Sequence, residues 1–284
     1  MIYILYNPLS NNKKGEEVVD EVCKLFAGKE LKKINVLEIK NSAEFCATFT
    51  SNDELVLCGG DGTLHKFANE VYGKNIEAKI YYFPAGSGND FAHDVENIEK
   101  VYEKLIPIND CLKKLPIVTV NGEQKYFING IGFGIDGYCC EVGDEFRARG
   151  DEKINYAGIA IKGLLGKFHP SNAKVTVDGV TKEYKKVWLA PTMIGKYYGG
   201  GMKVAPNQDR FNAENTVSSV VWHGSGKLST LMVFPSIFKG EHVNHTKMIE
   251  IRSGHEVSVE FDKPQALQID GETIKNVTSY SVKF

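Results

Sequence analysis

The chain has 284 residues, of which 42% are hydrophobic and 25% are charged; this is the composition of a globular protein and excludes disorder, collagen and a long coiled coil. Lys and Arg number 34 against 36 Asp and Glu, and the net charge of -2 provides no broad basic surface for nucleic acid. The length is near the upper limit for one hydrophobic core and favours two domains. The sequence predicts no membrane-spanning helix and no secretory signal, and the six cysteines are expected to be free thiols in a reducing cytoplasm.

The first part of the chain, up to about residue 112, alternates apolar strands with amphipathic helices. Strands are predicted over residues 2–6, 34–39, 55–58 and 80–83. Helices are predicted over residues 16–27, over 42–49 with Ser42 as the N-cap, and from the glycines that follow residue 58 to about residue 72. Strands that alternate with helices form a parallel sheet covered on both faces, so this part is predicted to be an α/β domain.

The remainder of the chain is rich in strands and in hairpin turns. Asn121-Gly122 and Asp178-Gly179 each separate two apolar runs, and both dipeptides tolerate the positive φ angles of a tight turn. Further strands are predicted over residues 217–222, 248–251, 257–261 and 266–269, and helices over 138–149 and 154–168. An antiparallel β-sandwich or barrel is therefore expected.

A glycine-rich segment, Gly59-Gly60-Asp61-Gly62-Thr63, lies between a predicted strand and a predicted helix. Three glycines in four positions let backbone N–H groups approach an anion, and the helix that follows adds a partial positive charge. Asp61 would repel a bare phosphate, so it fits a site where Mg²⁺ or a sugar hydroxyl intervenes. A plain turn requires neither this much glycine nor the acid, and the segment predicts a phosphate-binding loop.

A second loop with the same character follows the next strand. It contains Gly86, Ser87, Gly88, Asn89 and Asp90. Because adjacent loops at the carboxyl ends of parallel strands form one crevice, both glycine loops are predicted to face the same ligand. Asn89 or Asp90 is alternatively the N-cap of the helix that follows.

Two other motifs allow a structural and a functional interpretation. The segment from Gly132 to Gly137 matches GxGxxG, but its strand belongs to a hairpin, so backbone packing at a strand-to-helix corner is predicted in place of a dinucleotide site. Asp270-Gly271-Glu272 is either a simple turn or a pair of carboxylates, one accepting a proton and the other holding a metal.

The ordered set of motifs resembles the diacylglycerol kinase catalytic-domain family, and is closest to the soluble bacterial-type lipid kinases, which are related to sphingosine and ceramide kinases. The matching segments are residues 59–63, residues 86–91, Asp270–Glu272, Asn7-Pro8 with Ser10, residues 127–136 and residues 199–206. The resemblance spans essentially the whole chain.

The resemblance implies an α/β ATP-binding domain over residues 1–112, to which the last strand can return, and a β-sandwich lipid-substrate domain over residues 113–284, with the active site in the cleft between them. It implies ATP and Mg²⁺ as cofactors. The implied ATP contacts are Asn7, Gly59, Gly60, Asp61, Gly62, Thr63, Gly86, Ser87, Gly88 and Asn89. Asp270 is the implied general base, Asp61 and Glu272 are further catalytic residues, and Asp90 and Glu272 are implied metal ligands.

The sequence departs from the family pattern at two places. Pro116 stands where family members usually carry an Asp that joins the water and metal network. Ala213-Glu214-Asn215 replaces the usual Asp-Gly of a structural Mg²⁺ site, where Glu214 is the candidate substitute ligand.

The expected function is ATP-dependent phosphorylation of a lipid hydroxyl, with diacylglycerol as the first candidate and phosphatidic acid as its product. Three alternatives remain open: a NAD kinase-like enzyme, which shares the Gly-Gly-Asp-Gly-Thr signature, a non-catalytic nucleotide-binding protein at the membrane, and a dinucleotide-dependent oxidoreductase. The protein is expected to be cytoplasmic and peripherally bound to a membrane that holds its lipid substrate. A homodimer is left open.

The segment 154–168 is the candidate for membrane contact, because it mixes apolar side chains with lysines. The apolar residues are Ile154, Ile161, Leu164, Leu165 and Phe168, and the lysines are Lys153, Lys162 and Lys167. The alternative is a helix packed on the sandwich.

Overall fold

A computed structural model describes residues 1–10, 15–151 and 154–284. The chain divides into two compact units, Met1–Leu115 and Pro116–Phe284, and each has a hydrophobic core of its own. Lys153, one of the lysines named above, lies outside the described residues.

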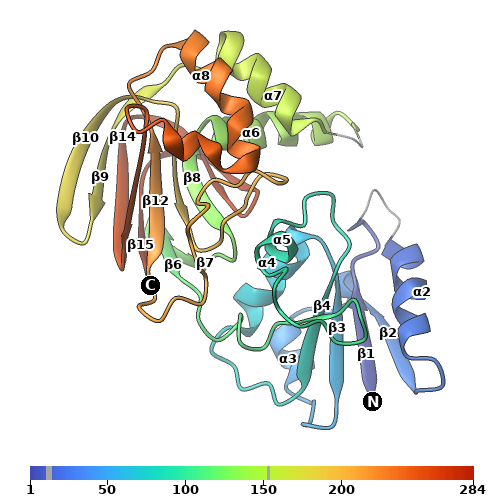
Figure 1. Ribbon diagram of the computed structural model, residues 1–284. Coiled ribbons are helices and arrows are strands. Elements are labelled where there is room, and N and C mark those ends of the chain that lie inside the picture. Colours follow the sequence, from blue (N-terminus) through green and yellow to red (C-terminus); the bar gives the residue numbers. More distant parts are fainter. Residues whose placement is uncertain (11–14, 152–153) are drawn as a thin grey trace. The chain divides into compact units, whose positions relative to one another are not determined.

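The first unit is an α/β domain built on a five-stranded sheet with strand order β2-β1-β3-β4-β5 (Figure 1). The strands are β1 (Ile2–Tyr6), β2 (Leu31–Asn35), β3 (Glu54–Gly59), β4 (Lys79–Pro84) and β5 (Ile106–Pro107). Strands β1 to β4 are parallel, and only the short β5 runs antiparallel, to β4. The predicted parallel sheet is therefore confirmed. Its central strand β3 is buried along most of its length, as a strand covered on both faces must be.

Short helices accompany these strands. They are α2 (Gly15–Leu25), η1 (Val36–Glu38), α3 (Ser42–Cys46), α4 (Asp61–Val71) and α5 (Asp90–Asp94). The strand predicted over 34–39 was wrong after Asn35, where β2 ends. The Asn35 side chain accepts the N–H of Leu37 at 2.9 Å and starts a 3₁₀ turn. The N-cap of α3 is Asn41, which accepts two N–H groups, and not Ser42 as the sequence predicted.

The second unit contains a strongly curved antiparallel sheet of ten strands. The main path runs β13-β12-β11-β8-β14-β15-β6-β7, and β9 pairs with both β14 and β10. The strands are β6 (Ile117–Val120), β7 (Glu123–Tyr126), β8 (Gly130–Gly134), β9 (Ser171–Val177), β10 (Val180–Val187), β11 (Leu189–Met193), β12 (Val217–Trp222), β13 (Ile249–Gly254), β14 (Glu256–Ile269) and β15 (Glu272–Lys283). Both predicted hairpin turns are present, since Asn121 (φ 52°) and Asp178 (φ 46°) have left-handed backbones.

Strand β14 joins two parts of this sheet. Its first half pairs with β9 and its second half with β8, and register shifts occur in between, so the two strands predicted over 257–261 and 266–269 are one. The last strand, β15, pairs with β14 and β6 and so belongs to the second unit; it does not return to the first.

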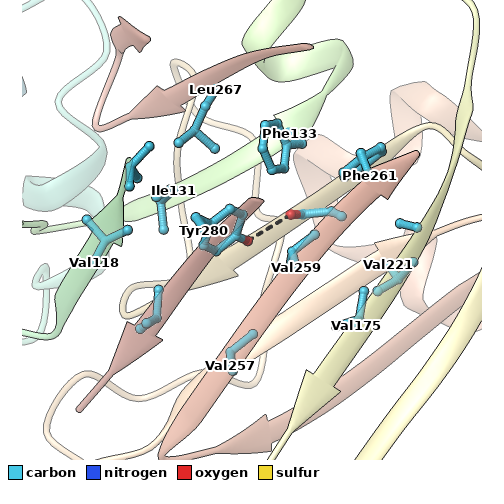
Figure 2. Packing of buried hydrophobic residues seen from close by; sticks show 14 of the residues in the cluster. Val118, Ile131, Phe133, Val175, Val221, Val257, Val259, Phe261, Leu267 and Tyr280 are labelled. Atoms are coloured by element: carbon cyan, nitrogen blue, oxygen red, sulfur yellow. Dashed lines mark hydrogen bonds between the residues drawn. The ribbon is translucent and has the colours of Figure 1, made fainter. Parts of the chain in front are cut away.

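The core of the second unit is enclosed by these strands. Figure 2 shows Phe133, Phe261, Val259 and Tyr280 converging from neighbouring strands, where Tyr280 donates its hydroxyl to the Ala190 carbonyl at 3.0 Å. The buried ring thus satisfies its one polar atom and keeps the apolar interior continuous.

Helices cover one side of this sheet (Figure 1). They are α6 (Ile135–Ala148), α7 (Tyr156–Lys162), the π-helical turn η2 (Gly163–Lys167), α8 (Lys227–Val233), η3 (Phe234–Lys239) and η4 (Glu241–Asn244). The GxGxxG segment forms the corner from β8 into α6. A Cβ on Gly134 (φ 105°) would meet the Trp188 carbonyl and one on Gly137 would meet the Ala266 carbonyl, so these glycines serve backbone packing, as the sequence predicted.

Candidate functional site

The two glycine loops of the first unit are in direct backbone contact. They follow β3 and β4, which are neighbours, and the Ala85 N–H donates to the Gly59 carbonyl at 2.8 Å just beyond the strands. A Cβ on Gly60 would lie 3.0 Å from the Gly86 Cα, and one on Gly86 would lie 2.6 Å from the Gly60 Cα. Gly60 has an ordinary φ of -88°. Close approach of the two loops, and not a positive φ, therefore explains why glycine stands there.

Asp61 links the same two loops. Its carboxylate accepts the N–H of Asp90 at 3.1 Å and that of Phe91 at 2.9 Å, which are the first N–H groups of α5. The acid predicted to face a metal or sugar thus caps the helix of the neighbouring loop.

Asn89 makes no side-chain cap to α5, contrary to one of the sequence alternatives. Its backbone is left-handed (φ 53°), and its amide closes the loop on itself by accepting the Gly86 N–H at 2.8 Å and donating to the Gly86 carbonyl at 3.0 Å. Asp90 is buried, Ser87 is exposed and Gly88 is half-buried.

Asn7 and Thr63 complete the loop after β3. The Asn7 side-chain amide donates to the Thr63 hydroxyl at 3.2 Å, and the Asn7 N–H donates to the Cys58 carbonyl at 3.2 Å. A Cβ on Gly59 would collide with the Thr63 side chain. The structure therefore brings the predicted nucleotide residues of the first unit together.

The start of α4 is open to an anion. Gly62 lies in its first turn, and no atom lies within 4 Å of the place where a Cβ of Gly62 would stand. The N–H groups of Thr63 and Leu64 donate to the Gly60 carbonyl at 3.0 and 3.1 Å. The N-terminus of this 11-residue helix carries a partial positive charge, which favours a nearby anion.

Asp270 occupies the turn between β14 and β15 in the second unit. Asp270 (φ 47°) and Gly271 (φ 90°) supply the two left-handed residues of a tight hairpin. The Asp270 carboxylate also accepts three backbone N–H groups, from Ile128 at 2.6 Å, Asn129 at 2.8 Å and Gly130 at 3.0 Å. The turn interpretation of this motif is thus correct, and the residue also anchors the start of β8; a role in proton transfer stays a proposal.

Of the candidate metal ligands, Asp90 belongs to the first unit, and Glu214 and Glu272 belong to the second. Glu272 is 51% exposed and lies 3.6 Å from the Lys125 ammonium, and Glu214 is exposed in the loop before β12. Within the parts of the chain that the structure describes, no group of three or more His, Cys, Asp or Glu side chains could hold an ion. Pro116 supplies only its carbonyl, which accepts the Phe127 N–H at 3.4 Å.

One buried acid was missed by the sequence interpretation. Asp136, the second residue of α6, is 4% exposed, and among the described residues neither of its carboxylate oxygens has a hydrogen-bond partner. The Tyr198 hydroxyl and the Gln268 side-chain nitrogen are likewise buried without a partner. Burial raises the pKa of Asp136 to about 7. The available signal was an acid two residues after the apolar, glycine-rich strand β8.

Comparisons with known proteins agree with this geometry. The diacylglycerol kinase catalytic domain matches residues 1–120, and the YegS C-terminal NAD kinase beta sandwich-like domain matches residues 129–281. The second of these matches covers more than half of the chain, so the chain belongs to the family with the YegS C-terminal NAD kinase beta sandwich-like domain. Its relatives are named diacylglycerol kinase or putative lipid kinase, which supports a lipid kinase family.

Individual relatives are distant. A diacylglycerol kinase of Bacillus subtilis (strain 168) is 23% identical over 287 residues, covering 95% of this chain and 88% of the relative. A diacylglycerol kinase of Mycobacterium tuberculosis (strain H37Rv) is 24% identical over 204 residues, covering 69% of this chain and 63% of the relative. The crystal structure of a diacylglycerol kinase from Bacillus anthracis str. Sterne superimposes with a TM-score of 0.62 at 17% identity, covering 99% and 93% of the two chains, and supports the fold. None of the described helices is both long and apolar enough to span a bilayer.

Proposed function

We propose that the protein transfers the γ-phosphoryl group of ATP to the hydroxyl of diacylglycerol and so produces phosphatidic acid and ADP. The observation that carries the proposal is the pair of glycine loops in backbone contact beside the start of α4, within residues that match the diacylglycerol kinase catalytic domain. The names of the relatives support diacylglycerol as the acceptor.

In this proposal the first unit binds the nucleotide. N–H groups at the start of α4 bind phosphate oxygens, and the absence of a side chain at Gly62 leaves room for the phosphates there. Asn7 and Thr63 hold the loop after β3 in shape, and Asp61 fixes the second loop through α5. A preformed loop lowers the cost of ordering the phosphates for transfer.

Asp270 is the proposed proton acceptor in the second unit. As the lipid oxygen bonds to the γ-phosphorus and the bond to the ADP oxygen breaks, the hydroxyl proton passes to the Asp270 carboxylate and then to solvent. The three N–H groups that bind this carboxylate hold it in one orientation. A divalent ion would arrive with the nucleotide, since Mg²⁺ is commonly held by substrate phosphates with few protein carboxylates.

An acceptor panel tests the proposal. Purified protein with γ-labelled ATP and Mg²⁺ is offered diacylglycerol, phosphatidylglycerol, a long-chain base and NAD in separate reactions, and the products are separated by chromatography. We expect label in the diacylglycerol reaction. Label on NAD alone identifies the NAD kinase-like alternative, and nucleotide binding without transfer to any acceptor identifies a non-catalytic binder; either outcome overturns the proposal.

A further inference from the structure

Two neighbouring helical segments of the second unit expose an unusual amount of apolar surface. Ten large hydrophobic side chains are exposed among the described residues, and five of them lie on the segment formed by α7 and η2 or on that formed by α8 and η3. These five are Ile161 (43% exposed), Leu165 (62%), Leu228 (72%), Met232 (75%) and Phe238 (42%). We call the outer surface of residues 156–168 and 227–239 the helical patch.

The opposite side of these two segments is buried in the core, which fixes their orientation. Ile159, Leu164 and Phe168 of the first segment pack into the same core cluster as Phe234 and Ile237 of the second. The alternative drawn from the sequence, a helix packed on the sandwich, therefore holds for Leu164 and Phe168. Ile154 is partly buried against the same cluster, whereas Ile161 and Leu165 are exposed.

The exposed side chains lie on one face of each segment. Ile161 and Leu165 are four residues apart, as are Leu228 and Met232, so each pair lies on one face of its helix. The two segments touch, since the Lys227 ammonium donates to the Gly166 carbonyl at 3.3 Å, and Figure 1 shows α7 and α8 on the same side of the sheet. Both segments therefore lie next to each other on one side of the sheet.

The charged side chains within the two segments are all basic. Residues 156–168 and 227–239 contain Lys162, Lys167, Lys227 and Lys239 and no Asp or Glu, although the whole chain carries a net charge of -2. A core-facing helix needs no such bias, whereas apolar side chains flanked by lysines match the headgroups and acyl region of an anionic membrane.

We infer that the helical patch docks the protein on a bilayer that contains anionic lipid. The inference rests on the proposed function in one respect, since a lipid acceptor resides in a membrane and none of the described helices could span it. Leu165, Leu228 and Met232 enter the interface between headgroups and acyl chains, and the four lysines pair with lipid phosphates.

Vesicle flotation of the purified full-length chain without nucleotide tests the inference. We expect binding to phosphatidylcholine vesicles that contain phosphatidylglycerol, and little binding to phosphatidylcholine alone. Leu228→Ser with Met232→Ser should lower the partition coefficient at least ~10-fold, because less apolar surface can be buried. Lys162→Glu with Lys167→Glu should lower it more than ~10-fold, at about 1 kcal/mol per lysine near an anionic surface with the charge reversed.

Matched controls separate docking from folding. Leu37→Ser removes an exposed leucine (57%) from the first unit, and Lys32→Glu with Lys185→Glu reverses the charge of two exposed lysines outside the helical patch. Both controls should bind vesicles as the unchanged protein does. Phosphorylation of a short-chain, water-dispersed diacylglycerol should be unchanged in the helical-patch variants, which shows that they fold.

Two results would overturn the inference. One is unchanged flotation of both helical-patch variants. The other is a dimer of the native protein that Leu228→Ser with Met232→Ser converts to a monomer, because a second copy of the chain would then occupy the surface. Flotation does not depend on phosphoryl transfer, so a protein that binds vesicles but phosphorylates no lipid refutes the proposed function and leaves the docking surface standing.

Discussion

Asp136 gives the sharpest test of the structure through the pH dependence of stability. The carboxyl group is buried beside Tyr198 and Gln268, and its pKa is raised from 3.8 to about 7. A raised pKa means that the folded protein keeps a proton that the unfolded chain releases. The contribution to stability is therefore fully present below the unfolded pKa and is lost as the pH rises through the folded pKa. The full difference between the two pKa values corresponds to about 4 kcal/mol of unfolding free energy.

Asp136→Asn removes this titration while it keeps the size of the side chain. We expect the unfolding free energy of the variant, relative to the native protein, to increase by about 2–3 kcal/mol between pH 5 and pH 8. Urea unfolding followed by circular dichroism at several pH values measures it, and Asp151→Asn, at an exposed carboxylate, is the control. A difference between the Asp136→Asn variant and the native protein that does not change with pH would refute a buried, raised-pKa carboxyl group.

Three further predictions concern the loops and turns. Gly60→Ala should abolish ATP-dependent activity in a folded protein, because its Cβ would separate the two glycine loops; full activity of this variant would remove the loop contact from the mechanism. At Gly62 a Cβ would have open space, so Gly62→Ala should leave the melting temperature unchanged and weaken ATP binding in a calorimetric titration. Asp270→Asn should lower kcat ~10²–10⁴-fold with ATP affinity kept, and a rate within a few-fold of the native value would leave Asp270 as a turn residue only. Gly134→Ala should lower the free energy of unfolding in urea by about 2–4 kcal/mol. Gly179→Ala, at a position with a positive φ but no clash, should lower it by about 1 kcal/mol, and equal losses would contradict the packing role of Gly134.

Local patterns in the sequence predicted the elements that depend on local chemistry. The parallel strands of the first unit, the Asn121-Gly122 and Asp178-Gly179 hairpins and the glycine loops all follow from periodicity and turn residues. The strand predicted over 34–39 failed because the Asn35 side chain bonds a backbone N–H two residues on, a local competition that hydrophobic periodicity does not register.

Contacts between distant segments could not be predicted in this way. Asp61 caps a helix about 30 residues further along the chain, and Asp270 binds N–H groups about 140 residues before it. Both acids lie in motifs that the sequence analysis named, but their hydrogen-bond partners depend on how the strands pair. The same limit explains Asp136, whose burial follows from the packing of α6 on the sheet, and Met232, which no motif marked as exposed.

The most direct test of the central claim is the fate of the γ-phosphoryl group when the purified protein receives labelled ATP, Mg²⁺ and diacylglycerol in mixed micelles. Thin-layer chromatography with mass spectrometry of the labelled lipid identifies the product. The account predicts phosphatidic acid, formed by the native protein and lost in Gly60→Ala. Label that remains in ATP, or appears only as inorganic phosphate, in a preparation that binds ATP would contradict the claim that this chain is a diacylglycerol kinase.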